Sequence, residues 1–236
     1  LLRAVSHDLR TPLTSMIGAS SSYLENEAAL PPKEKRELVS EIYEDANWLL
    51  HMVENLLSVT RITDGGASVL KKTPEAAEEV LFDAVSTSRK RYPDLQIKAV
   101  IPDEFVTAPM DPLLIKQVLL NLIENAYFHA HSTKPLECTL SSTEDAIKFC
   151  IRDYGTGIAP DRLSGIFDAV PSAPSSAAST VDTRKGMGIG LSICKAIVNA
   201  HNGEITARNL TEGAEFCFTI PKEEIHHETY DPNPRH

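Results

Sequence analysis

The chain has 236 residues, of which 42% are hydrophobic, 23 are Lys or Arg and 33 are Asp or Glu. This length allows one large domain or two modest ones, each with enough apolar side chains for a core, so a small disulfide-stapled protein is excluded. The net charge of -10 argues against nucleic acid as a partner, because no Lys/Arg cluster offsets it.

Four cysteines, Cys138, Cys150, Cys194 and Cys217, lie in apolar stretches and lack the Cys-x-x-Cys spacing typical of metal sites. We therefore expect four buried free thiols in a reducing compartment. The sequence shows neither an apolar run long enough to cross a bilayer nor a signal peptide. We therefore expect a soluble, cytoplasmic stretch. Because it opens without Met, we expect it to be a fragment of a longer protein that contacts a membrane only through segments absent here.

Residues 2–63 have the periodicity of two helices, interrupted at Leu30-Pro31-Pro32, where consecutive prolines favour a turn. Each helix carries one apolar stripe, formed by Leu2, Val5, Leu9, Leu13 and Met16 in the first and by Leu38, Ile42, Leu49, Val53 and Leu56 in the second. Two helices cannot cover both stripes well, so we predict a homodimer in which two hairpins form a four-helix bundle. Alternatively, the stripes pack on the rest of the same chain.

The breaker cluster Asp64-Gly65-Gly66 predicts an interdomain linker, which divides the chain into residues 1–66, residues 67–222 and a tail at 223–236. The second region alternates predicted helices and strands and is therefore expected to form an α+β sandwich with hairpins in its sheet. The predicted helices are 74–91, 112–129 and 190–201, and the predicted strands are 96–101, 137–141, 146–152, 204–209 and 215–220. Residues 171–180, PSAPSSAAST, predict a mobile loop.

The first helix contains the segment HDLRTPL, in which His7 falls on the side opposite the apolar stripe and is predicted to face solvent. The neighbouring Asp8 can accept a ring N–H and leave the other nitrogen free to attack, which suits a nucleophilic imidazole. Thr11 follows one turn later on nearly the same face, and Pro12 is expected to bend the helix. The alternative is an ordinary solvated histidine.

Two glycine-rich segments indicate a phosphate site. Asp153-Tyr154-Gly155-Thr156-Gly157 follows a predicted strand, and Gly186-Met187-Gly188-Ile189-Gly190 opens a predicted helix, where backbone amides and the helix dipole favour an anion. Asn121 and Asn125 share one helix face, and their amide oxygens can bind Mg²⁺ beside nucleotide phosphates. Alternatively, these are ordinary turns and solvent-facing amides.

The segments HDLRTPL, NLIENA, DYGTGI, IFDAV and GMGIGL occur in this order over about residues 1 to 221. Together they resemble the dimerisation and catalytic core of the sensor histidine kinases of two-component signalling. Residues 6–26 and 30–57 are similar in particular to the Kdp-type kinases that respond to potassium and turgor. The implied fold is the dimeric bundle followed by an α/β-sandwich ATP-binding domain of the Bergerat (GHKL) type.

The resemblance also implies roles for individual residues. His7 would accept the γ-phosphoryl group of ATP with Asp8 as its activating base, and Thr11 would act in dephosphorylation of a response-regulator partner. Asn125 would hold Mg²⁺, with Asn121 on the same helix face, and Asp153 would bind the adenine amino group. The remaining pocket residues would be Gly155, Gly157, Lys185, Gly186, Gly188 and Gly190.

Two positions discriminate between alternatives. Relatives that hydrolyse ATP directly have Glu where this chain has Asn121, so a kinase is favoured over an ATP-driven conformational machine. Phe128 stands where the family usually has a basic residue, which leaves Arg184 or Lys185 to contact the phosphates. The second functional hypothesis is therefore a dimeric signalling scaffold with weakened ATP use that mainly binds the regulator.

Overall fold

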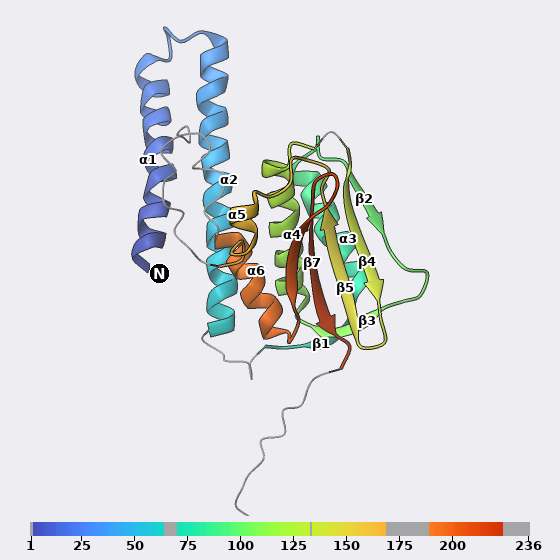
Figure 1. Ribbon diagram of the computed structural model, residues 1–236. Helices are drawn as coiled ribbons and strands as arrows, with labels where there is room; N and C mark the ends of the chain where they lie inside the picture. Colours follow the sequence, from blue (N-terminus) through green and yellow to red (C-terminus); the bar gives the residue numbers. More distant parts are fainter. Residues whose placement is uncertain (1, 64–69, 133, 169–188, 224–236) are drawn as a thin grey trace, which may run out of the picture. The chain divides into compact units, whose positions relative to one another are not determined.

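The computed structural model describes residues 2–63, 70–132, 134–168 and 189–223. The chain divides into two compact units, Leu1–Leu57 and Ser58–His236. The first consists of long helices, and the second combines helices with β-sheet (Figure 1). Among the described residues, none of the helices combines the length and apolar character needed to span a bilayer. The predicted loop at 171–180 and the tail beyond residue 223 lie outside the described residues.

The first unit is the predicted helical hairpin. Helix α1 (Leu2–Asn26) and helix α2 (Pro32–Thr63) flank the predicted break, and Pro32 begins α2, where a proline costs no helical hydrogen bond. The Ser15 hydroxyl donates to the Glu41 carboxylate (3.0 Å) and joins the helices. Large apolar side chains nevertheless stay exposed along the hairpin, namely Leu13, Ile17, Leu24, Val39, Tyr43, Leu50, Val53 and Leu57.

The second unit contains a five-stranded sheet with the order β2-β4-β5-β7-β6. The strands are β2 (Ile97–Val100), β4 (Leu136–Ser142), β5 (Ala146–Arg152), β7 (Ala214–Pro221) and β6 (Ile205–Asn209). The β2–β4 pair is parallel, whereas β4–β5, β5–β7 and β6–β7 are antiparallel. The predicted strands and hairpins are therefore confirmed.

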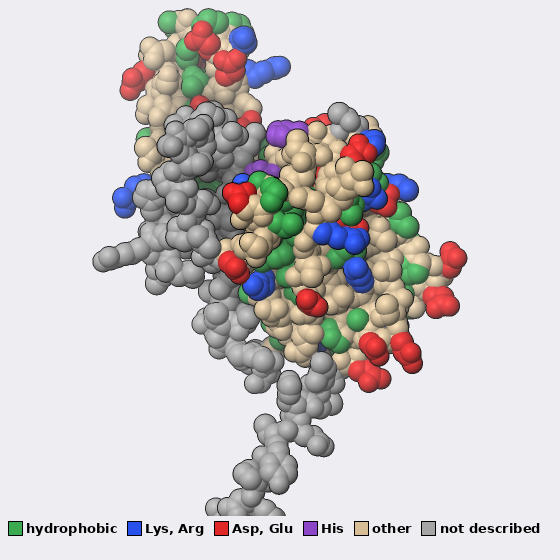
Figure 2. Space-filling model, in the orientation of Figure 1, with side chains coloured by type: hydrophobic (Ala, Val, Ile, Leu, Met, Phe, Trp, Pro, Cys, Tyr) green, Lys and Arg blue, Asp and Glu red, His purple; other side chains and the backbone are tan. Residues whose placement is uncertain are grey.

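Helices α3 (Ala77–Arg91), α4 (Pro112–His129) and α6 (Ile189–Ala200) lie against one face of this sheet (Figure 1). The shared core includes Leu81, Leu119, Ile123, Phe149, Ile197 and Phe218, all buried. Alternate residues of β5 face away from the helices and are only half-buried. Acidic and basic side chains are interspersed over the visible face of this unit (Figure 2).

Three short elements were not predicted. Strands β1 (Thr73–Ala76) and β3 (Thr107–Met110) form a separate antiparallel pair in which Pro74 lies opposite Pro109. Helix α5 (Pro160–Leu163) has a single turn. Four-residue elements containing proline carry almost no periodic signal, and the strand β1 occupies the residues at which a helix was predicted to begin.

The prediction of four free thiols is wrong for two of them. Cys150 and Cys217 form a disulfide between β5 and β7, because the register places them directly opposite each other. Cys138 and Cys194 are buried and free, as predicted. The sequence could not reveal the pairing, since the two cysteines are 67 residues apart and meet only through the order of the strands.

Candidate nucleotide site

Helix α4 supplies the asparagine face of the site. It begins after Asp111, whose carboxylate accepts the backbone N–H groups of Leu113 (3.0 Å) and Leu114 (3.2 Å). Asn125 is half-buried, and its side chain makes no hydrogen bond with the residues that the structure describes. Its amide oxygen is therefore available to a ligand.

Asn121 has a different environment from Asn125. It is 7% exposed, accepts a hydrogen bond from the Gln117 amide (3.2 Å) and donates to the carbonyl of Gly190 (3.4 Å). The side chain thus connects α4 to the first turn of α6. Asn121 positions the start of α6, where the sequence predicted the second glycine segment to approach phosphate.

Asp153 lies immediately after β5 and is held by β7. Its backbone N–H donates to the Ala214 carbonyl (2.9 Å), and its Oδ1 accepts the backbone N–H groups of Gly155 (2.9 Å) and Ala214 (3.2 Å). The residue is 5% exposed. Two amide donors hold one carboxylate oxygen, while Oδ2 accepts no hydrogen bond from any described residue. A buried acceptor of this kind suits a ligand amino group.

The DYGTG segment turns closely around the end of α4, which explains the need for glycine. A Cβ at Gly155 would lie 1.7 Å from the carbonyl oxygen of Ala130, so no larger residue fits. The Thr156 N–H donates to the same carbonyl (3.3 Å). Gly157 has φ +74°, a conformation that other residues adopt at a cost.

Asn209 helps to shape the site, and the sequence analysis did not predict it. It lies at the end of β6, accepts the N–H of Ile158 (2.8 Å) and donates to the carbonyl of Ile158 (2.7 Å). This side chain holds the segment just after Gly157. The two residues are 51 positions apart, and no pattern in the sequence indicates their contact.

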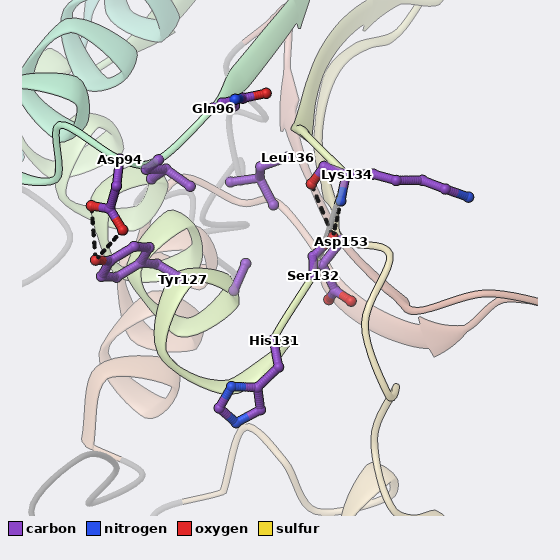
Figure 3. Close-up of a pocket in the computed structure, with 10 residues that line it drawn as sticks. Asp94, Gln96, Tyr127, His131, Ser132, Lys134, Leu136 and Asp153 are labelled. Carbon is purple, nitrogen blue, oxygen red and sulfur yellow. Dashed lines mark hydrogen bonds between the residues drawn. The ribbon is translucent and has the colours of Figure 1, made fainter.

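A cavity of about 240 Å³ opens beside the C-terminal end of α4 (Figure 3). Asp153 forms part of its wall, and the labelled lining residues Asp94, Tyr127, His131, Ser132 and Lys134 come from different segments of the second unit. The Tyr127 hydroxyl donates to the Asp94 carboxylate (3.0 Å), and burial together with this contact raises the pKa of Tyr127. The cavity was not anticipated from the sequence.

Phe128 occupies an aromatic cluster. Its ring packs edge-on against Tyr92 and Tyr127, with ring centres 5.6 Å and 5.0 Å apart. The position that the family usually fills with a basic residue is therefore a packing position here. The Arg91 guanidinium lies beside this cluster and pairs with Glu124 (2.7 Å), whose carboxylate also accepts the Tyr92 hydroxyl.

The other predicted site residues are placed less fully. His7, Asp8 and Thr11 lie on α1 in the first unit, and the Thr11 side chain is exposed. Gly190 lies in the first turn of α6. Lys185, Gly186 and Gly188 fall outside the described residues.

Comparison with known proteins identifies both regions. Residues 1–65 match a model described as the His Kinase A (phospho-acceptor) domain, and residues 110–224 match one described as histidine kinase-, DNA gyrase B- and HSP90-like ATPase. Fold and site thus define an ATP-binding domain that follows a phosphoacceptor hairpin. The chain belongs to the sensor histidine kinases.

The similar proteins include two sensor proteins named KdpD. The sensor protein KdpD of Clostridium acetobutylicum is 42% identical over 94% of this chain, and KdpD of Escherichia coli is 34% identical over 94%. The chain spans 24% of the length of each. The solved complex of histidine kinase ThkA with the response regulator TrrA has a TM-score of 0.69 at 22% identity, covering 94% of this chain and 61% of ThkA, and this shows a common fold.

Proposed function

We propose that the chain is a kinase core that transfers the γ-phosphoryl group of ATP to His7, and from His7 to an aspartate of a response regulator. The observation that carries the proposal is the corner at Asp153, beside a glycine turn in an ATPase-type fold, where one oxygen of a buried carboxylate accepts no hydrogen bond from a described residue. The match of residues 1–65 to a phospho-acceptor domain supports the second half of the proposal, in which a residue of this hairpin receives the phosphoryl group.

The residues present fit ATP and Mg²⁺. The Asp153 Oδ2, which accepts no hydrogen bond from a described residue, suits the adenine amino group. The turn at Gly155 has no space for a side chain at that position. Asn125 offers a neutral oxygen ligand for Mg²⁺, which when bound neutralises phosphate charge. Asn121 and Gly190 would hold the start of α6, whose preceding residues Lys185, Gly186 and Gly188 would complete the pocket.

The chemistry asks the protein mainly for positioning. Phosphoryl transfer passes through a loose transition state, so in-line placement and charge stabilisation contribute most. The His7 imidazole would attack with the lone pair of one nitrogen while Asp8 accepts the N–H of the other. The N–P bond formed is labile, which suits transfer to a carboxylate.

The same proposal covers partners and location. The exposed apolar side chains of α1 and α2 support a homodimer, since a second hairpin would bury them. A response regulator would dock on this hairpin, and Thr11 would assist its dephosphorylation. The similarity to KdpD supports a cytoplasmic kinase core that serves a potassium-responsive sensor.

A direct experiment uses γ-labelled ATP. The chain incubated with Mg²⁺ should acquire label that is lost in acid and retained in alkali, as a phosphoramidate is. Addition of a receiver domain should then move the label to that protein. Absence of acid-labile label in a folded chain that binds ATP would contradict the proposal.

A second candidate, the scaffold with weakened ATP use, is favoured by one observation. Phe128 packs among aromatic rings and offers no charge to a phosphate. Calorimetric titration with a non-hydrolysable ATP analogue distinguishes the kinase from the scaffold. A dissociation constant in the micromolar range supports the kinase. A dissociation constant above about 1 mM, which corresponds to a binding free energy weaker than about 4 kcal/mol, supports the scaffold.

A further inference from the structure

The pair Cys150 and Cys217 lies on the sheet face that points away from the core helices. The backbone N–H of Asp153 donates to the Ala214 carbonyl, which makes the odd-numbered residues of β5 the hydrogen-bonded positions. Cys150 and Cys217 therefore occupy a non-hydrogen-bonded position, where opposed side chains approach most closely. Their Cα atoms are 4.1 Å apart.

The sheet holds the two sulfur atoms together independently of the bond between them. Ile151 pairs with Phe216 on one side of the cysteines, and Phe149 pairs with Phe218 on the other, where their rings stack at 4.9 Å. All four of these side chains are buried. The strands therefore keep their register whether the cysteines are oxidised or reduced.

The two cysteines differ in access. Cys150 is half-buried, whereas Cys217 is 5% exposed. A small thiol can therefore reach the sulfur of Cys150 first, and Cys217 is placed to act as the resolving or leaving group.

Charged side chains of both signs surround the pair. Lys148 and Arg152 lie two residues to either side of the cysteine on the same face of β5, and Arg152 lies opposite Glu137 of β4 and Glu215 of β7. The carboxylate of Glu215 also lies within 4.8 Å of the sulfur atoms. Its charge is offset by Arg208, whose Nε donates to Glu215 Oε2 (2.6 Å).

The remaining cysteines provide an internal contrast. Burial raises the pKa of both Cys138 and Cys194 to about 12, so these thiols stay protonated at neutral pH. Cys138 lies in the core and Cys194 is enclosed between α6 and α4. Of the four cysteines, Cys150 alone is not buried.

We propose that Cys150 and Cys217 form a reversible dithiol–disulfide site that exchanges with low-molecular-weight thiols. In oxidation, the Cys150 thiolate attacks a small-molecule disulfide, forms a mixed disulfide and releases one thiolate. The Cys217 thiolate then attacks the Cys150 sulfur and releases the second thiolate. The protein loses two electrons and two protons, and the small disulfide becomes two thiols.

The test uses the native full chain in buffers of varied glutathione to glutathione-disulfide ratio. Free thiols are alkylated without unfolding and mapped by mass spectrometry. Cys150 and Cys217 should change together as one two-electron transition, while Cys138 and Cys194 react only after denaturation. Circular dichroism should show the same secondary structure in both forms.

Matched single variants test the order of attack. Cys217→Ser leaves the accessible Cys150, and Cys150→Ser leaves the buried Cys217. Mixed-disulfide formation with glutathione should be at least about tenfold faster in Cys217→Ser. Equal rates in two folded variants would contradict the assignment of Cys150 as the entry point.

Two results with the unsubstituted chain would overturn the proposal. In the first, the disulfide opens only when the chain unfolds, which would make it a structural bond. In the second, the reduced pair resists oxidation until a chelator removes one zinc ion per chain, which would make Cys150, Cys217 and Glu215 a metal site.

Discussion

Asn125 and Asn121 lie one turn apart on α4 but have different hydrogen-bond environments. Asn121 is bonded to neighbours on α4 and α6, whereas Asn125 is half-buried without a bond to a described residue. Asn125→Ala should therefore leave the melting temperature nearly unchanged and reduce Mg²⁺-dependent phosphorylation at least tenfold, or about 1.4 kcal/mol. The exposed Asn199→Ala is the control, and unchanged kinetics in Asn125→Ala would remove it from the site.

Thr11 is exposed on α1, one turn after His7. Its hydroxyl can hold a water molecule by one hydrogen bond in line with an aspartyl phosphate on a regulator. Thr11→Ala should slow regulator dephosphorylation several-fold more than it slows autophosphorylation. If both rates fall together, or if only the melting temperature changes, Thr11 supports the helix around Pro12 and has no phosphatase role.

His201 makes stability depend on pH. Its Nε2 accepts the Asp111 N–H (3.0 Å) and its Nδ1 donates to the Ile197 carbonyl (2.8 Å), which fixes the neutral ring. Burial, with a contribution from Lys72, lowers the pKa of His201. Below about pH 6.5 the unfolded chain therefore binds a proton that the folded chain does not. The free energy of unfolding consequently decreases as the pH is lowered.

Urea denaturation at pH 7.5 and pH 5.5 measures this effect. The unsubstituted chain should lose more stability between the two pH values than His201→Gln does. The variant should also be less stable at pH 7.5 by roughly 1 kcal/mol, because a buried hydrogen bond is lost. An identical pH dependence in both proteins would contradict the assignment.

At the scale of elements, the hairpin has more apolar surface than its two helices cover. Val53 belongs to the predicted stripe of α2 and remains 46% exposed. Val53→Glu should place an unpaired carboxylate in the dimer interface and split the dimer, at a cost of several kcal/mol. Ser40→Glu, an exposed position on the same helix, should leave it intact. Light scattering distinguishes the two, and a dimeric Val53→Glu would place the interface elsewhere.

Long periodic elements could be predicted, and short or non-local ones could not. The hairpin break at Pro31-Pro32 and helix α4 follow from proline placement and apolar spacing. Strand β1, by contrast, depends on pairing with β3 across the intervening helix α3. The Cys150–Cys217 bond likewise depends on sheet register, which the chain order of the strands does not specify.

The site was predictable to the extent that its residues are contiguous in sequence. Asn125, Asp153 and Gly155 belong to local segments, and the structure explains the glycine by its contact with Ala130. Asn209 and Ala214 were missed because they reach the same corner from distant strands through side-chain and backbone bonds. Such contacts appear only once the strand order is known.

At the scale of the whole molecule, the proposed reaction divides between the two units. The hairpin carries His7, and the sheet unit carries the nucleotide site at Asp153 and Asn125. Substitutions at the site residues of either unit should therefore abolish phosphorylation, but for different reasons that can be measured separately. A hairpin variant should retain nucleotide affinity, and a site variant should retain an intact acceptor helix.

The most direct test is to map the phosphoryl group under alkaline conditions after incubation with Mg²⁺ and ATP. Peptide mass spectrometry should place it on His7, and His7→Gln should carry no acid-labile phosphate while keeping nucleotide affinity. His51→Gln, a histidine on helix α2 of the hairpin, should be phosphorylated normally. Acid-labile phosphate on another residue, or its persistence in His7→Gln, would contradict the account.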